Sequence, residues 1–198
     1  MRLSVKTLIA DCVNEVIKAH YPMQYYSLCH VYAIVGANLI SIATARDFRP
    51  VAGLAAVDCG NGRLMLMADD TAFACSEGGA YHCWIESVGD AHSDRQIVDL
   101  TFRHNHIYAE NNGFHWTLAP PPAFLWGLQS DLLLNATLTS LPRTFPEGQV
   151  WLSETEAGTA WMTQQLLEHQ NAFVTLTAEA LRRFSRGLLS PESDFNEI

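Results

Sequence analysis

Residues 28–45 limit the fold more than any other stretch of the chain, because they are apolar on nearly every side of a helix. The run approaches the length of a membrane span, yet it contains His30 and Asn38 and no cluster of Lys or Arg flanks it. A helix of this kind is covered on several sides by the rest of a protein. We therefore predict a buried central helix over residues 27–45, with Ser27 as its N-cap.

Periodicity predicts the elements around this helix. Apolar residues recur at helical spacing over residues 5–20, and the residue before Pro22 ends that helix. Short runs rich in β-forming residues indicate antiparallel strands at 50–59, 63–67, 80–88 and 96–102. No strand–helix–strand rhythm accompanies them, so we predict an α+β fold rather than a doubly wound one.

The C-terminal part predicts more helices. A capping-box pattern at residues 153–156 opens a helix that runs to about 171, and Thr177 caps a last helix that ends near Gly187. Residues 103–150 show no clear element. We predict one domain over residues 1–190 and a flexible tail over 191–198.

Charge and cysteine content narrow the classes of partner and compartment. The net charge of −9 disfavours nucleic acid and anionic membranes, which are bound by basic surfaces. The first apolar run is broken by Asp11 and Glu15, unlike a signal peptide. Five irregularly spaced cysteines favour reduced thiols and a cytoplasmic location. Oligomeric state is left open.

Cys29 is the first candidate for chemistry, because it lies at the predicted start of the buried helix. The positive end of the helix dipole and the free N–H groups of the first turn favour a thiolate, the nucleophilic form of cysteine. The same N–H groups could hold an oxyanion. Taken alone, Cys29 is better explained as a small buried apolar residue.

His82 and Asp99 supply the partners of such a thiol. If residues 80–88 and 96–102 pair as a hairpin, His82 falls opposite residue 99 or 100. Alternation then places His82, Trp84 and Glu86 on the same face as Ile97, Asp99 and Thr101. Asp99 among apolar neighbours would be costly to bury unless it is paired. Each residue alone could be structural, but their order along the chain favours a Cys29–His82–Asp99 triad.

The segments around His82 and Asp99 resemble a known signature. His82-Cys83-Trp84-Ile85-Glu86, followed by Ile97-Val98-Asp99-Leu100-Thr101, is similar to the "His-x-Trp-x-Glu … Asp-x-Thr" pattern of transglutaminase-like domains in the papain-like superfamily. The resemblance implies Cys29 as nucleophile, His82 as general base and acid, and Asp99 as the residue that orients His82. It implies Gln24, or Tyr25 or Tyr26 in its place, as an oxyanion donor, with Trp84 beside the substrate.

The expected function is that of a thiol hydrolase or acyltransferase. It would act on a peptide, amide or other acyl substrate through a thioester, with no metal or organic cofactor. One alternative is an inactive binding domain of the same fold. A second is a zinc site formed by Cys59, Cys75, His82 and Cys83, although no close Cys pair is present. Histidines 104, 106 and 115 are expected to be solvated loop residues, and Trp116, Phe124, Trp126 and Trp151 to be core or interface residues.

Overall fold

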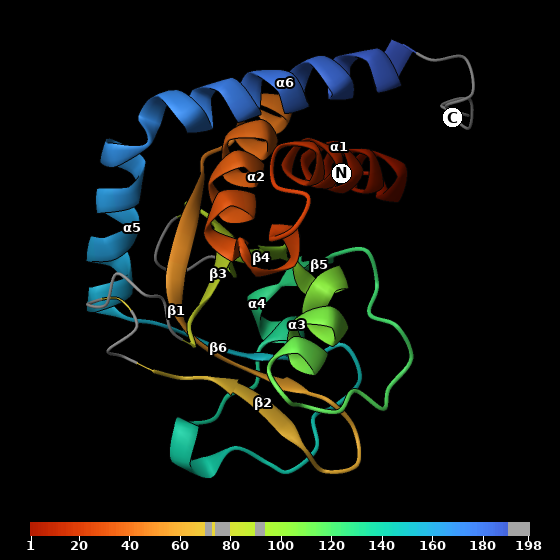
Figure 1. Ribbon diagram of the computed structural model, residues 1–198, viewed down its shortest axis with the longest axis vertical. Helices are drawn as coiled ribbons and strands as arrows, with labels where there is room; N and C mark the ends of the chain where they lie inside the picture. Colours follow the sequence, from red (N-terminus) through yellow and green to blue (C-terminus); the bar gives the residue numbers. More distant parts are fainter. Residues whose placement is uncertain (70–72, 74–79, 90–93, 190–198) are drawn as a thin grey trace.

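The helix α2, Cys29–Thr44, lies at the centre of the computed structural model, which describes residues 1–69, 73, 80–89 and 94–189. Figure 1 shows α2 between the sheet below and α6, Gln170–Leu189, above, with α1, Leu3–His20, beside it. Most residues of α2 are buried. At Gly36 an added Cβ would lie 2.7 Å from the Ile85 side chain, so the missing side chain lets the helix approach the sheet closely.

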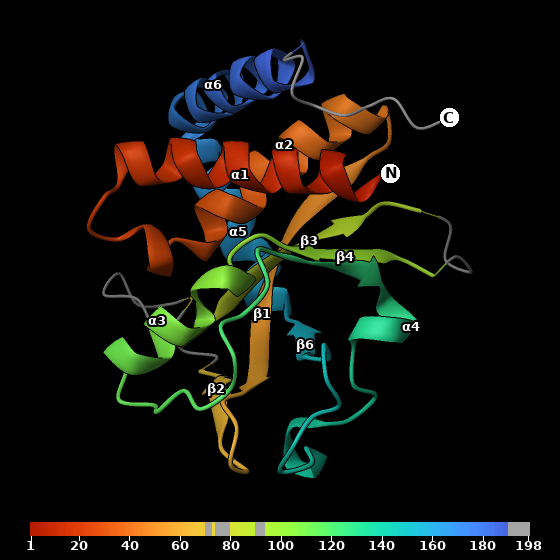
Figure 2. The same ribbon diagram turned by 90° about the vertical axis from the view of Figure 1, so that its right-hand side faces the viewer.

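The six-stranded sheet is antiparallel in all of its five pairings and follows the order β2-β1-β3-β4-β5, with β6 also paired to β1. An α+β fold with an antiparallel sheet is therefore confirmed. Figure 2 shows α1, α2 and α6 stacked on one side of this sheet. The strands are β1 Phe48–Asp58, β2 Leu64–Met67, β3 His82–Ser87, β4 Gln96–Asp99, β5 Leu125–Leu128 and β6 Trp151–Glu154.

Several shorter helical elements connect these layers. They are the 3-10 turns η1 Tyr25–Ser27, η3 Phe102–His104 and η4 Leu138–Ser140, and the helices α3 Asn105–Asn111, α4 Gln129–Leu132 and α5 Glu156–Glu168. Residues 103–150, which carry no clear sequence signal, thus contain α3, β5, α4 and η4. The predicted tail over residues 191–198 lies outside the described residues.

Three predicted helix boundaries are wrong. The N-cap of α2 is Leu28 rather than Ser27, which belongs to η1 and donates its Oγ to the carbonyl of Gln24. The predicted helix start at 153 is strand β6, and α5 begins after Thr155, whose hydroxyl accepts the N–H of Gly158. Thr177 does not cap a helix but lies inside α6. The predicted start at residue 153 is too early because residues up to Glu154 pair with β1 as part of strand β6.

Apolar residues gather on both sides of the sheet. The larger cluster joins buried side chains of α1, α2 and α6 to Cys83, Ile85 and Val98 of the sheet. A second cluster joins β1 and β2 to Phe102, Ala109 and Leu125. Among the helices described, none is long and apolar enough to span a membrane.

Candidate active site

His82 and Asp99 form a buried hydrogen-bonded pair on neighbouring strands. His82 begins β3 and Asp99 ends β4, and Nε2 of the imidazole lies 2.9 Å from Oδ2 of the carboxylate. Each residue is only 4% exposed. The second oxygen, Oδ1, accepts the N–H of Thr101 at 2.8 Å and its hydroxyl at 2.6 Å. Both carboxylate oxygens are satisfied, which offsets much of the penalty of burying the charge.

The register of the two strands differs from the expected one. Ile85 pairs with Val98 and Glu86 with Ile97, and this register carried onward places His82 across from residue 101. The expectation that His82 lies opposite residue 99 or 100 is therefore wrong. Asp99 nevertheless stays on the face of His82, because residue 101 and residue 99 share a face. The contact is diagonal, within the reach of a long side chain.

The pair favours a charged imidazole. Burial lowers the pKa of His82, but the charge and hydrogen bond of Asp99, with smaller effects of Cys29, outweigh it and raise that pKa to about 10. Burial also raises the pKa of Asp99, yet His82 and Thr101 outweigh it and hold that pKa below its ordinary value. At neutral pH an imidazolium therefore faces a carboxylate.

Cys29 is the first residue of α2 and is buried. The chain reaches it through η1, and the cap residue Leu28 lies outside the helical region at φ −94° and ψ 46°. The N–H groups of Val31 and Tyr32 donate to the carbonyl of Leu28, whereas those of Cys29 and His30 have no acceptor among the described residues. These two N–H groups lie at the positive end of the helix dipole. The sulfur thus lies where a negative charge is stabilised.

Neighbouring side chains strengthen this effect. Hydrogen bonding from the Cys83 thiol is the largest influence that lowers the pKa of Cys29, followed by that from His82 and by the charges of His82 and His30. Burial acts in the opposite direction, but the pKa of Cys29 remains well below its ordinary value. Cys29, His82 and Asp99 are therefore brought together as a continuous chain of interacting groups.

The other described cysteines differ from Cys29 in this respect. Burial and the charges of Glu15 and Asp11 raise the pKa of Cys12 to about 11. Burial also raises the pKa of Cys59 and, more strongly, that of Cys83. Of the described thiols, Cys29 alone is stabilised as a thiolate near neutral pH.

Cys83, which the sequence suggested only as a zinc ligand, is a neighbour of Cys29. Its pKa is raised well above the ordinary value by burial and then by Cys29, so it stays a thiol and can act as a donor. Strand alternation points Cys83 away from His82, and only the position of α2 over β3 shows that it meets Cys29. The sequence therefore offered no local signal for this contact.

Removal of that donor is expected to weaken the thiolate. Cys83→Ala should slow alkylation of Cys29 at pH 6 by about tenfold, because a hydrogen bond to a charged group contributes on the order of 1.5 kcal/mol or more. The rate measured at pH 6 and pH 9, with the modified peptide identified by mass spectrometry, tests this. Cys59→Ala removes a buried thiol from the second apolar cluster and is the matched control. A Cys83→Ala variant with the wild-type rate at pH 6 would contradict the expectation.

Aromatic rings pack together close to Cys29. The ring of Trp161, from α5, lies 5.5 Å from that of His30 and 4.9 Å from that of Tyr81. Nδ1 of His30 is buried without a hydrogen-bond partner among the described residues. The negative charge of Cys29 also raises the pKa of Tyr81, after burial as the larger cause, which places this ring near the sulfur.

The four expected oxyanion and substrate residues lie in the segment before Cys29 and on β3. Gln24 is exposed and precedes η1. Tyr25 packs its ring 5.0 Å from His104 and 5.8 Å from Tyr26, and Lys18 lies over it. Trp84 is buried on β3, and its Nε1 donates to Oε1 of Glu86 at 3.0 Å. Among the described residues, no hydrogen bond joins these four candidates to the Cys29 side chain.

Glu86 shows why Trp84 is held in place. Its Oε2 accepts hydrogen bonds from Arg49 at 3.0 Å and from Arg95 at 3.1 Å, while Oε1 accepts from the Trp84 ring. Arg49 also pairs with Glu154 of β6. The Trp and Glu of the sequence signature thus form a structural network that ties β3 to its neighbours.

The residues of the alternative zinc site do not come together in the described part of the chain, and one predicted loop histidine is buried. Cys59 belongs to a different apolar cluster from Cys83, and Cys75 lies outside the described residues. Within the part of the chain that the structure describes, no group of three or more His, Cys, Asp or Glu side chains could hold a metal ion. The expectation that His104 is solvated is wrong, because it is 5% exposed and bonded to Tyr32 and Asn14.

Comparison with known proteins supports the fold only. No family model matches the chain, and no curated protein matches it. The solved structure described as "The crystal structure of genomics APC5867" is similar over 92% of this chain and 79% of that chain, with a TM-score of 0.62 and 15% sequence identity. The similarity extends over most of the chain and concerns its architecture.

Proposed function

We propose that this protein is a papain-like or transglutaminase-like thiol hydrolase or acyltransferase that uses Cys29 as its nucleophile. One observation carries the proposal. The single described thiol whose pKa is lowered interacts with the imidazole of His82, and the far nitrogen of that imidazole is bound to the buried carboxylate of Asp99. This is the relation between nucleophile, base and orienting group that acyl transfer requires.

The roles of the two imidazole nitrogens follow from the hydrogen bonds. Asp99 accepts a hydrogen bond from Nε2–H, and that proton stays on the imidazole. Nδ1 is therefore the nitrogen that exchanges a proton with Cys29 and then with the leaving group. The thiolate attacks the acyl carbonyl, and the oxyanion forms at the N-terminus of α2, where the free N–H groups lie. Nδ1–H protonates the departing amine or alcohol, and a thioester to Cys29 remains.

The second half of the reaction regenerates the thiolate. Nδ1, now neutral, takes a proton from a water molecule or from an acceptor amine as it attacks the thioester carbonyl. The carbon–sulfur bond breaks, the acyl group leaves as an acid or amide, and the imidazolium faces the thiolate again. The substrate is a peptide, amide or other acyl compound, and the proposed steps use no metal or organic cofactor.

Alkylation of Cys29 as a function of pH tests the proposal. The lowered pKa of Cys29 and the raised pKa of His82, about 10, leave thiolate and imidazolium together across neutral pH. Iodoacetamide should therefore modify Cys29 as fast at pH 7 as at pH 8, and the rate should fall only on acidification, when the thiolate is protonated. Cys12, whose pKa is raised to about 11, should react far more slowly at both values.

Two variants and an acylation assay complete the experiment. His82→Ala should abolish the fast reaction, whereas Cys29→Ala should remove the labelled peptide. An activated ester should then leave an acyl group on Cys29, seen as a mass increase in the wild type alone. If Cys29 reacts no faster than Cys12 and Cys59 in the folded protein, the proposal fails, and an inactive member of the same fold is the better description.

A further inference from the structure

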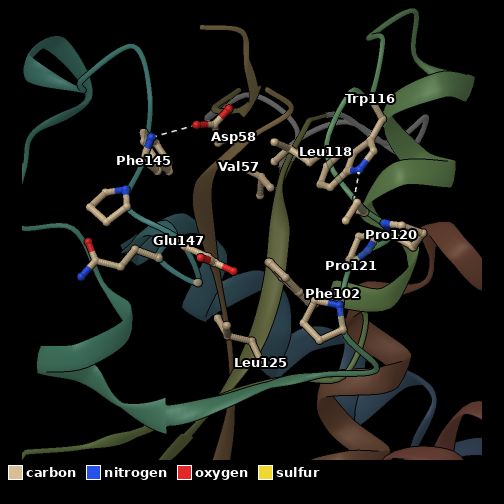
Figure 3. A pocket seen from close by; sticks show the side chains of 15 residues that line it. Val57, Asp58, Phe102, Trp116, Leu118, Pro120, Pro121, Leu125, Phe145 and Glu147 are labelled. Atoms are coloured by element: carbon tan, nitrogen blue, oxygen red, sulfur yellow. Dashed lines mark hydrogen bonds between the residues drawn. The ribbon is translucent and has the colours of Figure 1, made fainter. Parts of the chain in front are cut away.

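A cavity of about 540 Å³ lies away from the candidate active site, and none of its lining residues is Cys29, His82 or Asp99. Figure 3 shows it between two walls, one formed by residues 116–122 and the other by residues 145–149. The end of β1 and the side chains of Phe102 and Leu125 close it from below. Its volume falls within the range of small-molecule sites.

The two walls are held in position by hydrogen bonds that do not need a ligand. The carboxylate of Asp58 accepts the N–H of Gly60 at 2.7 Å and the N–H of Phe145 at 2.8 Å, which ties one wall to β1. On the other side Thr117 donates its N–H and its hydroxyl to the carbonyl of Cys59. The rings of Pro120 and Pro121 further restrict the backbone. The cavity is therefore largely formed before any ligand binds.

The chemistry of the walls selects one charge. Both oxygens of Asp58 are used by backbone N–H groups, so the carboxylate left for a ligand is that of Glu147, which Figure 3 shows turned into the space between the walls. No hydrogen bond to Glu147 is found among the described residues. No Lys, Arg or His is among the described lining residues, so nothing there would compensate a bound anion.

The remaining surface suits an apolar body. The indole of Trp116 forms part of one wall and directs its Nε1 to the carbonyl of Ala119 at 3.2 Å, which leaves its ring face for contact. Trp is the aromatic side chain that attracts cations most strongly through its face. Phe102, Leu125 and Phe145 add further apolar surface.

We propose that this cavity binds a small organic cation, an amine carried on an aromatic or branched apolar body. Glu147 pairs with the ammonium group. The apolar part of the ligand packs against the Trp116 wall and against Phe102 at the base of the cavity. The negative net charge of −9 adds a favourable field for such a ligand. The inference is independent of the proposed thiol chemistry, because it uses no residue of that site.

Three probes with one ring system and different charge test the inference. Tryptamine is cationic at pH 7, tryptophol is neutral and indole-3-propionate is anionic. Binding is followed by NMR shifts of residues 116–122 and 145–149 together with calorimetry. Tryptamine should bind most tightly, with a dissociation constant on the order of 1 mM or below, and indole-3-propionate most weakly.

Variants separate a specific ion pair from a general effect of charge. Glu147→Gln should weaken tryptamine binding by about two- to fivefold and leave tryptophol unchanged, as expected for an ion pair with an exposed carboxylate. Trp116→Leu should weaken both probes by about tenfold. Glu156→Gln changes the net charge equally on an exposed site of α5 and should alter neither.

Each other outcome overturns the proposal. No saturable binding of tryptamine would show that the cavity takes no organic cation. Equal affinity for tryptamine and either of the other probes would remove the selection for positive charge. An equal effect of Glu147→Gln and Glu156→Gln would assign the preference to net charge rather than to the cavity. Alkylation of Cys29 in Glu147→Gln should remain at the wild-type rate in every case.

Discussion

Asp99→Asn is expected to slow the alkylation of Cys29 at pH 6 by roughly 100-fold or more, because a thiol with an ordinary pKa of about 8.5 is less than about 1% thiolate at that pH. Thr101 donates both its N–H and its hydroxyl to one oxygen of Asp99, so an Asn there would keep its carbonyl at that position. Its NH₂ group would then point at Nε2 of His82. Nε2 would have to accept instead of donate, and the proton would move to Nδ1, which could no longer take the proton of Cys29.

The measurement is the alkylation rate of Cys29 between pH 5 and pH 9 in wild type and variant. The loss should be large at pH 6 and small at pH 9, where an ordinary thiol also ionises. Asp11→Asn is the matched control, because Asp11 pairs with Arg103 at a half-exposed site away from His82. A wild-type pH profile in Asp99→Asn would show that the carboxylate does not act through His82.

Gly53→Ala is expected to lower the free energy of unfolding by about 3 kcal/mol or more. A Cβ at this position would lie 2.1 Å from the carbonyl oxygen of Ser153 and 2.9 Å from the Cα of Glu154, and both atoms belong to the backbone of β6. A backbone cannot move aside as a side chain can. Gly53 also pairs with His82 on β3, so the strain reaches the candidate site.

Gly127→Ala provides the comparison. Gly127 is likewise in a strand, β5, but its added Cβ would meet only the side chain of Leu132, at 3.1 Å. That side chain can turn away, so we expect a loss below about 1 kcal/mol. Urea unfolding followed by circular dichroism measures both. Equal losses in the two variants would show that the contact with β6 yields as readily as a leucine side chain.

The parts of the fold that follow from burial could be predicted from the sequence. An apolar run with no polar face has to be covered on all sides, which identifies α2 as the central helix. Alternation around His82 and Asp99 fixes the faces of β3 and β4 even though the register was wrong, because a shift from residue 99 to residue 101 keeps the face.

The parts that depend on remote contacts could not be predicted. His104 is buried because Tyr32 and Asn14, on two other helices, bind its ring. β5 and α4 have only four residues each, too few for a periodic signal, and pairing with β4 holds β5 in place. The contact of Cys83 with Cys29 likewise depends on where α2 begins over the sheet. Local sequence patterns carry none of this information.

The cover that α6 provides over α2 has a consequence for the synthesis of the protein. Phe173, Leu176, Ala180 and Phe184 of α6 complete the same apolar cluster as α1 and α2, and Thr177 accepts a hydrogen bond from Asn38. On a ribosome, α2 leaves the exit tunnel long before α6 is synthesised. The side of α2 that α6 covers therefore stays exposed through much of translation, a stage at which a chaperone could shield it.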